Sequence, residues 1–215
     1  MQEKPNLKID WATHEAAKYA CENWHYSKCL PVGKLVKIGV WENGKFIGVV
    51  LFSRGASPFL LDKYSVEKNK GCELTRVALT KHITPVSKIM KFAFLFLKKA
   101  CDGIELIVSF ADPSEGHHGG IYQAGNWIYT GESNPTIEYF LDRRWQHVRG
   151  SYYKKNENTP VRTRQGKHRY LMPLTSQMKE KIIHLAKPYP KRVTKAPSEY
   201  PSDSGGAVPT HTLHP

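Results

Sequence analysis

The chain has 215 residues, and 32 Lys and Arg against 19 Asp and Glu give it a formal net charge of +13 at pH 7. A hydrophobic share of 40% excludes a wholly disordered chain, and no stretch approaches the ~18 consecutive apolar residues of a membrane-spanning helix. The N-terminus lacks a basic segment followed by an apolar core, so we expect no secretory signal and a cytoplasmic protein. The four cysteines form no Cys-x-x-Cys pair, which favours reduced thiols. The positive charge predicts a polyanionic partner, with nucleic acid ahead of an anionic membrane or an acidic protein.

Helix and strand patterns alternate along the chain. Thr13 is a suitable N-cap for a helix that continues to about Trp24. An Asn-Gly pair at 43–44 joins two β-rich runs and predicts an antiparallel hairpin over 35–52. Thr84-Pro85 is typical of a helix start. The pattern predicts further strands at 72–79, 104–110, 127–130 and 137–141, and helices from 84 to about 100, at 119–124 and at 176–186.

The charge is concentrated in one segment. Residues 141–170 contain nine Lys and Arg but two acidic residues, with four aromatic residues among them. Cations attract phosphates and aromatic rings stack on bases, so this segment is a candidate DNA-binding region, although a solvated basic loop would show the same composition. Its candidate DNA-binding residues are Arg143, Arg144, Arg149, Lys154, Lys155, Arg162, Arg164 and Lys167. We expect one domain over 1–187 and a flexible, proline-rich tail over 188–215.

The order of elements resembles the GNAT acyltransferase superfamily, in which a hairpin leads to a strand, a turn and a long helix. The resemblance implies an α/β fold with a mixed, mostly antiparallel central sheet flanked by helices. It also implies acetyl-CoA in a cleft between splayed strands, with the pyrophosphate on the amides at the start of the long helix. Val77, Leu79 and Ser87 are the cofactor-binding candidates that it implies. The turn at 80–87 departs from the superfamily pattern, because it has no glycine and Pro85 removes one amide donor.

Three longer motifs carry a closer resemblance. They are WHYS at 24–27 with LPVGK at 30–34, ELTRVAL at 73–79 with TPVS at 84–87, and SFADP at 109–113 with GHHGGIYQAGNW at 116–127. Together they resemble the bacteriophage Mom family of DNA-modification proteins over about residues 20–135. The resemblance implies an enzyme that converts adenine in DNA to an N6-methylcarbamoyl derivative and so protects phage DNA from host restriction. It further implies a location in the cytoplasm of the infected or lysogenic host, an acyl-type or glycine-type donor, and iron as a possible participant.

Five residues are candidate catalytic residues. Asp112 follows an apolar strand, where ligands bind in α/β sheets, and can serve as a base toward an exocyclic amine or as a metal ligand; the alternative is an Asx-turn or cap before Ser114. His25 and Tyr26 suit proton transfer, metal ligation or base stacking. Arg76, in an apolar strand, either pairs with a carboxylate at 73 or 112 or meets an anionic substrate. Tyr122 either faces the cleft or packs in the core.

The histidines allow a metal hypothesis. His25, Asp112 and either His117 or His118 would form the two-histidine, one-carboxylate set that suits non-haem iron. Two other functions stay open at this stage: a GNAT enzyme that acetylates an amine on a small molecule or protein, and a DNA-binding protein without catalytic activity. The oligomeric state and the DNA sequence preference carry no signal in the chain.

Overall fold

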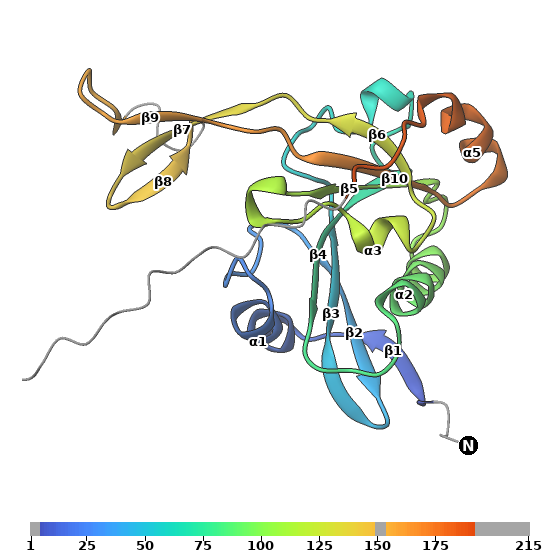
Figure 1. The fold of residues 1–215 in the computed structure, drawn as a ribbon. Helices are drawn as coiled ribbons and strands as arrows, with labels where there is room; N and C mark the ends of the chain where they lie inside the picture. The colour runs from blue at the N-terminus through green and yellow to red at the C-terminus, as the bar shows by residue number, and fades with distance from the viewer. Residues whose placement is uncertain (1–4, 149–153, 192–215) are drawn as a thin grey trace, which may run out of the picture.

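A computed structural model describes residues 5–148 and 154–191 (Figure 1). Arg149 and most of the predicted tail lie outside these ranges. A seven-stranded sheet has the order β1-β2-β3-β4-β5-β10-β6, and a smaller three-stranded sheet has the order β8-β7-β9. The strands are β1 Leu7–Trp11, β2 Val36–Glu42, β3 Lys45–Ser53, β4 Gly71–Leu79, β5 Leu106–Ala111, β6 Ile128–Glu132, β7 Thr136–Leu141, β8 Arg144–His147, β9 Val161–Arg164 and β10 His168–Pro173. The expected mixed, mostly antiparallel sheet is confirmed.

Helices cover both faces of the large sheet (Figure 1). Helix α1 (His14–Trp24) begins where the Thr13 side chain accepts a hydrogen bond from the Ala16 amide, and its buried alanines pack on β3 and β4. Helix α2 (Val86–Ala100) packs on the opposite face through residues such as Ile89 and Phe94. Helices α3 (Gly120–Gln123) and α5 (Ser176–Ile182) complete the body, with the short 3-10 turns η1 (Asp62–Tyr64), η2 (Pro113–Glu115) and η4 (Ile183–Leu185).

The two central strands diverge at a defined point. Strands β4 and β5 pair in parallel from Gly71↔Leu106 to Leu74↔Ser109, and β4 continues for five more residues without β5. At the same place the β3–β4 register shifts, so Thr75 is an extra residue that bulges out of the ladder. Bulges of this kind redirect neighbouring side chains and are common beside active sites. The sheet therefore opens beyond Leu74, as the GNAT resemblance implies.

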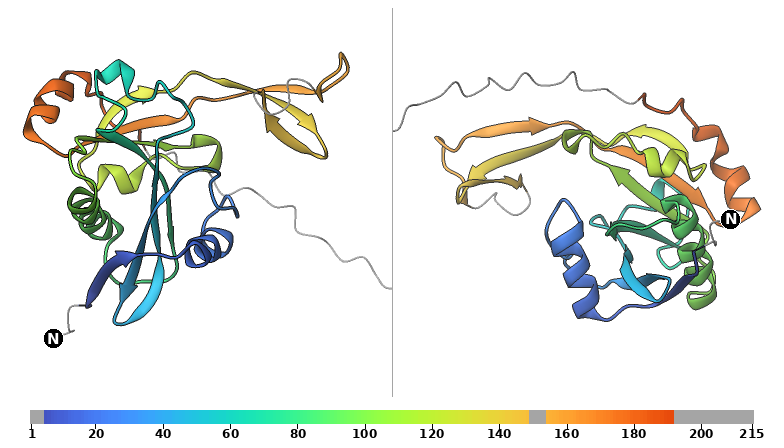
Figure 2. Two further views of the ribbon diagram at one scale, coloured as in Figure 1. Left: turned by 180° about the vertical axis from the view of Figure 1, so that it is seen from behind. Right: turned by 60° about the horizontal axis from the view of Figure 1, so that its bottom comes forward.

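The small sheet projects from the body as an arm (Figures 1 and 2). Strands β7, β8 and β9 form it, and a short connection leads from β9 to β10, which lies between β5 and β6 in the large sheet. One chain segment thus forms both a strand of the arm and a strand of the central sheet.

Most predicted elements are confirmed, with specific corrections. The hairpin turn is at Asn43-Gly44, and α1, α2 and α5 lie close to their predicted positions. The prediction missed β1, β8, β9 and β10. It also began the long helix at Thr84, whereas α2 begins at Val86 and Pro85 occupies the N-cap position without a side-chain hydrogen bond. No helix in the described ranges is long and apolar enough to cross a membrane.

Candidate functional site

A cavity of about 1040 Å³ opens where β4 and β5 diverge. Its walls come from the end of α1, strand β4, the loop from η2 to α3, and the base of the arm. This volume lies at the upper end of the range of about 300–1,000 Å³ that small-ligand sites occupy. Of the predicted catalytic residues, the cavity walls include His25, Tyr26, Arg76 and Tyr122 but not Asp112.

Three aromatic rings from distant motifs meet at the wall of the cavity. The centroid of the Tyr26 ring lies 4.3 Å from the His25 ring and 4.8 Å from the His117 ring. The Ser27 amide donates to His25 Nδ1, so the neutral imidazole carries its proton on Nε2. Burial, then the charges of Arg76 and His117, lower the pKa of His25 to about 4. His25 is therefore an uncharged, weakly basic hydrogen-bond donor at neutral pH.

Arg76 makes neither of the ion pairs expected for it. Its Nη1 donates to the Thr75 carbonyl oxygen over 2.9 Å, and its Nε is buried without a hydrogen-bond partner. Among the described residues, no carboxylate lies within ion-pair distance of its guanidinium; Asp112 binds other cations instead. A buried, unsatisfied charged donor is costly. The arrangement favours the other expectation, an anionic group bound in the cavity.

Tyr122 joins the core to the cavity. Its ring stacks with Tyr170 and its hydroxyl lies 2.8 Å from the Ser109 hydroxyl oxygen, which is also 2.8 Å from the Leu74 carbonyl oxygen. Burial raises the pKa of Tyr122 to about 12. The expected core packing is confirmed, and the same residue also forms part of the cavity wall.

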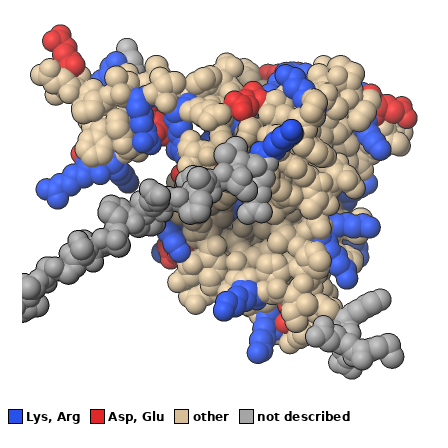
Figure 3. Space-filling view, viewed as in Figure 1, with Lys and Arg blue, Asp and Glu red and all other residues tan. Residues whose placement is uncertain are grey.

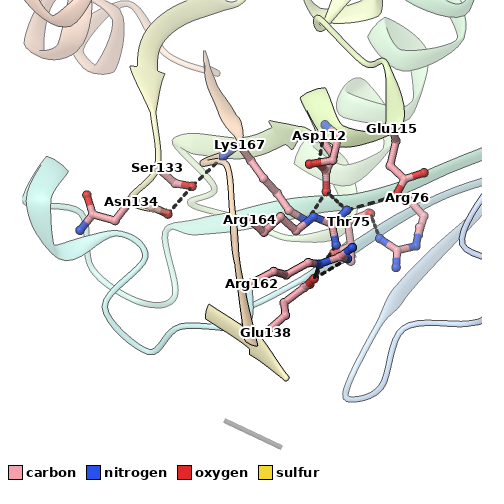
Figure 4. Close-up of polar contacts among 11 residues, drawn as sticks. Thr75, Arg76, Asp112, Glu115, Ser133, Asn134, Glu138, Arg162, Arg164 and Lys167 are labelled. Atoms are coloured by element: carbon pink, nitrogen blue, oxygen red, sulfur yellow. Dashed lines mark hydrogen bonds and ion pairs between the residues drawn. The ribbon is translucent and has the colours of Figure 1, made fainter. Parts of the chain in front are cut away.

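Asp112 lies in an ion-pair network at the base of the arm (Figure 4). Its side chain is 3% exposed, and its Oδ2 lies 2.9 Å from Arg164 and 3.2 Å from Lys167. The Ser114 amide donates to Oδ1, so the alternative cap role is confirmed. Burial raises the pKa of this carboxyl, but Lys167 and Arg164 outweigh it and hold the pKa below the usual value. A carboxylate so paired is a weak base, and a base role for Asp112 stays a prediction.

A second buried carboxylate extends this network into the arm. Glu138 on β7 binds Arg164 Nη1 at 3.2 Å, and it binds Arg162 through Nε at 2.9 Å and Nη2 at 2.6 Å (Figure 4). Arg164 therefore bridges the body at Asp112 and the arm at Glu138. The network fixes the base of the arm against the strand that precedes η2.

The predicted iron ligands do not come together. Within residues 5–148 and 154–191, no group of three His, Cys, Asp or Glu side chains is arranged to hold a metal ion. His25 Nδ1 is engaged by Ser27, and Asp112 is engaged by two cations. The residues predicted as an iron set, His25, Asp112, His117 and His118, thus do not fit that role in this structure, and we derive no step through a metal.

The turn before α2 does not fit a coenzyme pyrophosphate either. The buried Glu42 carboxylate accepts hydrogen bonds from the Ile83 and Thr84 amides, each over 2.8 Å. These amides lie in the turn that leads into the helix, so the protein's own carboxylate uses two donors of the turn and places a negative charge beside the helix start. Of the predicted cofactor residues, Val77 lies in the cavity wall, whereas Leu79 and Ser87 do not. We derive no step through coenzyme A.

Glu73 is a cavity carboxylate that sequence reasoning considered only as a partner for Arg76. It lies on β4 just before the divergence from β5 and forms part of the cavity wall. Among the described residues, no Lys, Arg or His lies within ion-pair distance of it. Burial raises the pKa of Glu73, and the Ala56 amide, Lys167 and Arg76 offset this only in part. Its position in the ELTR motif could have marked Glu73 as a candidate. The sequence pattern of a strand does not show, however, whether a carboxylate has a cation beside it in the fold.

The predicted DNA-binding residues divide into two groups. Arg162, Arg164 and Lys167 form ion pairs with Glu138 or Asp112. Arg143, Arg144 and Lys154 are exposed on the arm, and Lys155 donates to the Tyr139 hydroxyl. Figure 3 shows Lys and Arg side chains over the arm. The second group is exposed and does not bind Glu138 or Asp112.

Comparisons with known proteins agree with this architecture. The model of the Mom protein family matches residues 6–191. The chain is 24% identical over 203 residues to the methylcarbamoylase mom of Escherichia phage Mu, covering 86% of this chain and 84% of that protein. Among solved structures, an N-acyl amino acid synthase from uncultured soil microbes aligns with a TM-score of 0.50 at 10% identity, over 84% of this chain and 97% of that one. An acetyltransferase of Bacillus subtilis aligns with a TM-score of 0.46 at 14% identity, over 80% and 100% of the two chains. The chain shares its fold with the N-acyl amino acid synthase, in keeping with the expected GNAT-like architecture, and it belongs to the Mom protein family.

Proposed function

We propose that this protein transfers a methylcarbamoyl group to N6 of adenine in double-stranded DNA and thereby protects phage DNA from host restriction. One observation carries the proposal: in a member of the Mom protein family, a cavity with acid–base side chains opens directly beneath a basic arm. The relative in phage Mu is itself described as a methylcarbamoylase. The arm supplies charge that attracts a duplex, and the cavity is large enough for a base and a donor.

The chemistry requires two things of the protein. Adenine N6 lies inside the duplex, so the base has to leave the stack to enter a pocket. Its lone pair is delocalised into the ring, so a base has to accept a proton as the new bond forms. The N6 lone pair then bonds to the electrophilic carbon of an acyl-type or glycine-type donor, whose leaving group departs with the bonding electrons. The N6 proton passes to a carboxylate.

Glu73 is the carboxylate that best suits this proton transfer. It forms part of the cavity wall, lacks a cation within ion-pair distance among the described residues, and has a raised pKa. Asp112 is not part of the cavity wall, and its carboxylate is held by two cations that are part of that wall. Arg76, with its unpartnered Nε, is placed to bind an anionic group of the donor or of the extruded nucleotide. Tyr26, 47% exposed beside His25, is placed to contact the base.

Nucleoside mass spectrometry of plasmid DNA tests the function. We expect DNA from cells that express this chain to contain an adenosine heavier by one methylcarbamoyl group, and DNA from cells with an empty vector to lack it. Acetyl transfer to a small-molecule or protein amine, with unmodified plasmid DNA, would contradict the proposal and favour an ordinary acetyltransferase.

The Glu73→Gln variant tests the base. The amide keeps the size of the side chain but is not a proton acceptor of useful strength, so we expect modification to fall by two to four orders of magnitude. DNA affinity, measured by fluorescence anisotropy, should stay within about twofold because no phosphate contact is removed. Wild-type modification by Glu73→Gln would exclude this assignment.

A further inference from the structure

The arm has an inner face that is continuous with the cavity. In its antiparallel pairs, Glu138 lies opposite His147 and Arg162, and Phe140 lies opposite Trp145. Paired residues share a face of a sheet, and alternate residues of a strand do so too. The inner face therefore comprises Thr136, Glu138, Phe140, Trp145, His147, Arg162 and Arg164. Four of these, Thr136, Glu138, His147 and Arg164, belong to the cavity wall. The inner face thus extends from the cavity wall outward to the aromatic pair Phe140 and Trp145.

The aromatic pair is exposed yet held in place. Trp145 is 36% exposed and Phe140 is 40% exposed, with their ring centroids 5.3 Å apart in an edge-to-face arrangement. The Arg162 guanidinium lies 4.3 Å from the centroid of the Trp145 ring, and Glu138 fixes Arg162 through two hydrogen bonds. A ring fixed in this way loses little conformational entropy when it binds a partner. The Trp145 ring is thus held in one orientation by Phe140 and by Arg162.

The surroundings of the pair indicate a polyanionic partner. Arg143 and Arg144 lie at the β7–β8 turn, beside Trp145, and Lys154 is exposed on the same arm. Asp142 and Arg143 both have positive φ, +52° and +60°, in a turn where glycine would be less strained. Non-glycine residues in this region are strained and often mark functional sites. Aromatic rings among cations suit a nucleic-acid surface, where the rings stack on bases and the cations attract phosphates.

We propose that Trp145, held in place by Phe140 and Arg162, is a platform that stacks on a nucleobase next to the nucleotide whose base enters the cavity. This inference rests on the proposed DNA substrate and adds the contact that accompanies base extrusion. When a base leaves the duplex, the faces of its neighbours lose a stacking partner. Apolar side chains that fill such a gap stabilise the opened duplex. The platform lies on the face that continues into the cavity, which is where an adjacent nucleotide would be.

Binding of a duplex with 2-aminopurine in place of one adenine tests the platform. Trp145→Leu keeps an apolar side chain but removes the stacking face, and Trp145→Phe restores a ring. Stacking contributes about 1–3 kcal/mol per base, or about 5- to 150-fold in affinity. We expect Trp145→Leu to weaken binding by that factor and to diminish the 2-aminopurine fluorescence increase that reports extrusion, and Trp145→Phe to recover most of both. The slope of affinity against salt should not change, because no phosphate contact is lost.

Two controls make the outcome specific. Val161→Ala removes an apolar side chain that is 60% exposed on the outer face of the arm, and it should bind as the wild type does. Arg143→Ala with Arg144→Ala should reduce the salt slope by about two, without regard to sequence. Equal loss in Trp145→Leu and Val161→Ala, or no loss in Trp145→Leu, would overturn the platform. Phe140→Leu provides a second, independent test should Trp145→Leu fail to fold by circular dichroism.

The platform and the proposed function can be refuted independently of each other. Binding and extrusion are measured without donor or modification. DNA that binds through Trp145 but is never modified in cells would refute the methylcarbamoyl reaction alone. DNA that is modified, with binding and extrusion unaffected by Trp145→Leu, would refute the platform alone.

Discussion

Removing the charge of Asp112 should loosen the base of the arm. Asp112→Asn keeps an oxygen for the Ser114 amide but leaves Arg164 and Lys167 without their shared buried carboxylate. Removing one partner of a buried ion pair costs about 3–5 kcal/mol. Arg164 retains two other carboxylates and Lys167 is 46% exposed, so we expect the lower end, about 3 kcal/mol. The control Asp102→Asn, at an exposed turn after α2, should have little effect.

Urea unfolding at pH 7 measures the difference. With a slope near 2 kcal/mol/M, a loss of about 3 kcal/mol lowers the unfolding midpoint by about 1.5 M. The folded-state pKa of Asp112 lies below its unfolded value, so its stabilisation is present above about pH 4 and disappears as the pH falls through the folded value. The difference between wild type and variant should therefore close in acid. A variant that is as stable as the wild type but no longer modifies DNA would refute the anchoring role and support Asp112 as the base.

Two further predictions concern groups held by specific neighbours. Burial lowers the pKa of His25 to about 4, so its imidazole signals in NMR should titrate near pH 4. Because the unfolded chain binds this proton more tightly, the free energy of unfolding should fall as the pH falls from about 6.5 to 4. Titration near pH 6.5 would contradict the burial of His25. Glu42→Gln weakens the acceptor for the Ile83 and Thr84 amides, and we expect a loss of about 1–3 kcal/mol with faster hydrogen exchange at both amides. Unchanged exchange would show that the carboxylate does not hold the turn.

The local elements of the fold were predictable because their signals are local. The Thr13 cap, the Asn43-Gly44 turn and the apolar spacing of α2 each lie within a few residues of the structure that they specify. Strand β10 was missed because its basic, aromatic sequence resembles a surface loop. It is nevertheless central, paired with β5 and β6, and Tyr170 in it is fully buried. The position of β10 in the sheet depends on its pairing with β5 and β6, which are distant in the sequence.

The candidate site was predictable in part for the same reason. The motifs identified His25, Tyr26, Arg76 and Tyr122, and the structure brings all four to one cavity. The partner of Asp112 could not be predicted, because Arg164 is 52 residues away and its strand was not recognised. The basic segment therefore suggested a uniform phosphate clamp, whereas part of its charge neutralises the protein's own carboxylates.

The continuity of β9 and β10 has a mechanical consequence. The arm and the middle of the large sheet share one segment, and Arg164 and Lys167 in that segment are pinned to Asp112. Rotation of the arm about this junction would break the ion pairs to the buried Asp112. The arm should therefore keep a fixed orientation relative to the large sheet. On the proposed DNA substrate, a rigid arm would fix the distance between a duplex at its outer end and the cavity. A duplex would then have to bend or open to reach the cavity, and DNA sequences that deform easily would be favoured.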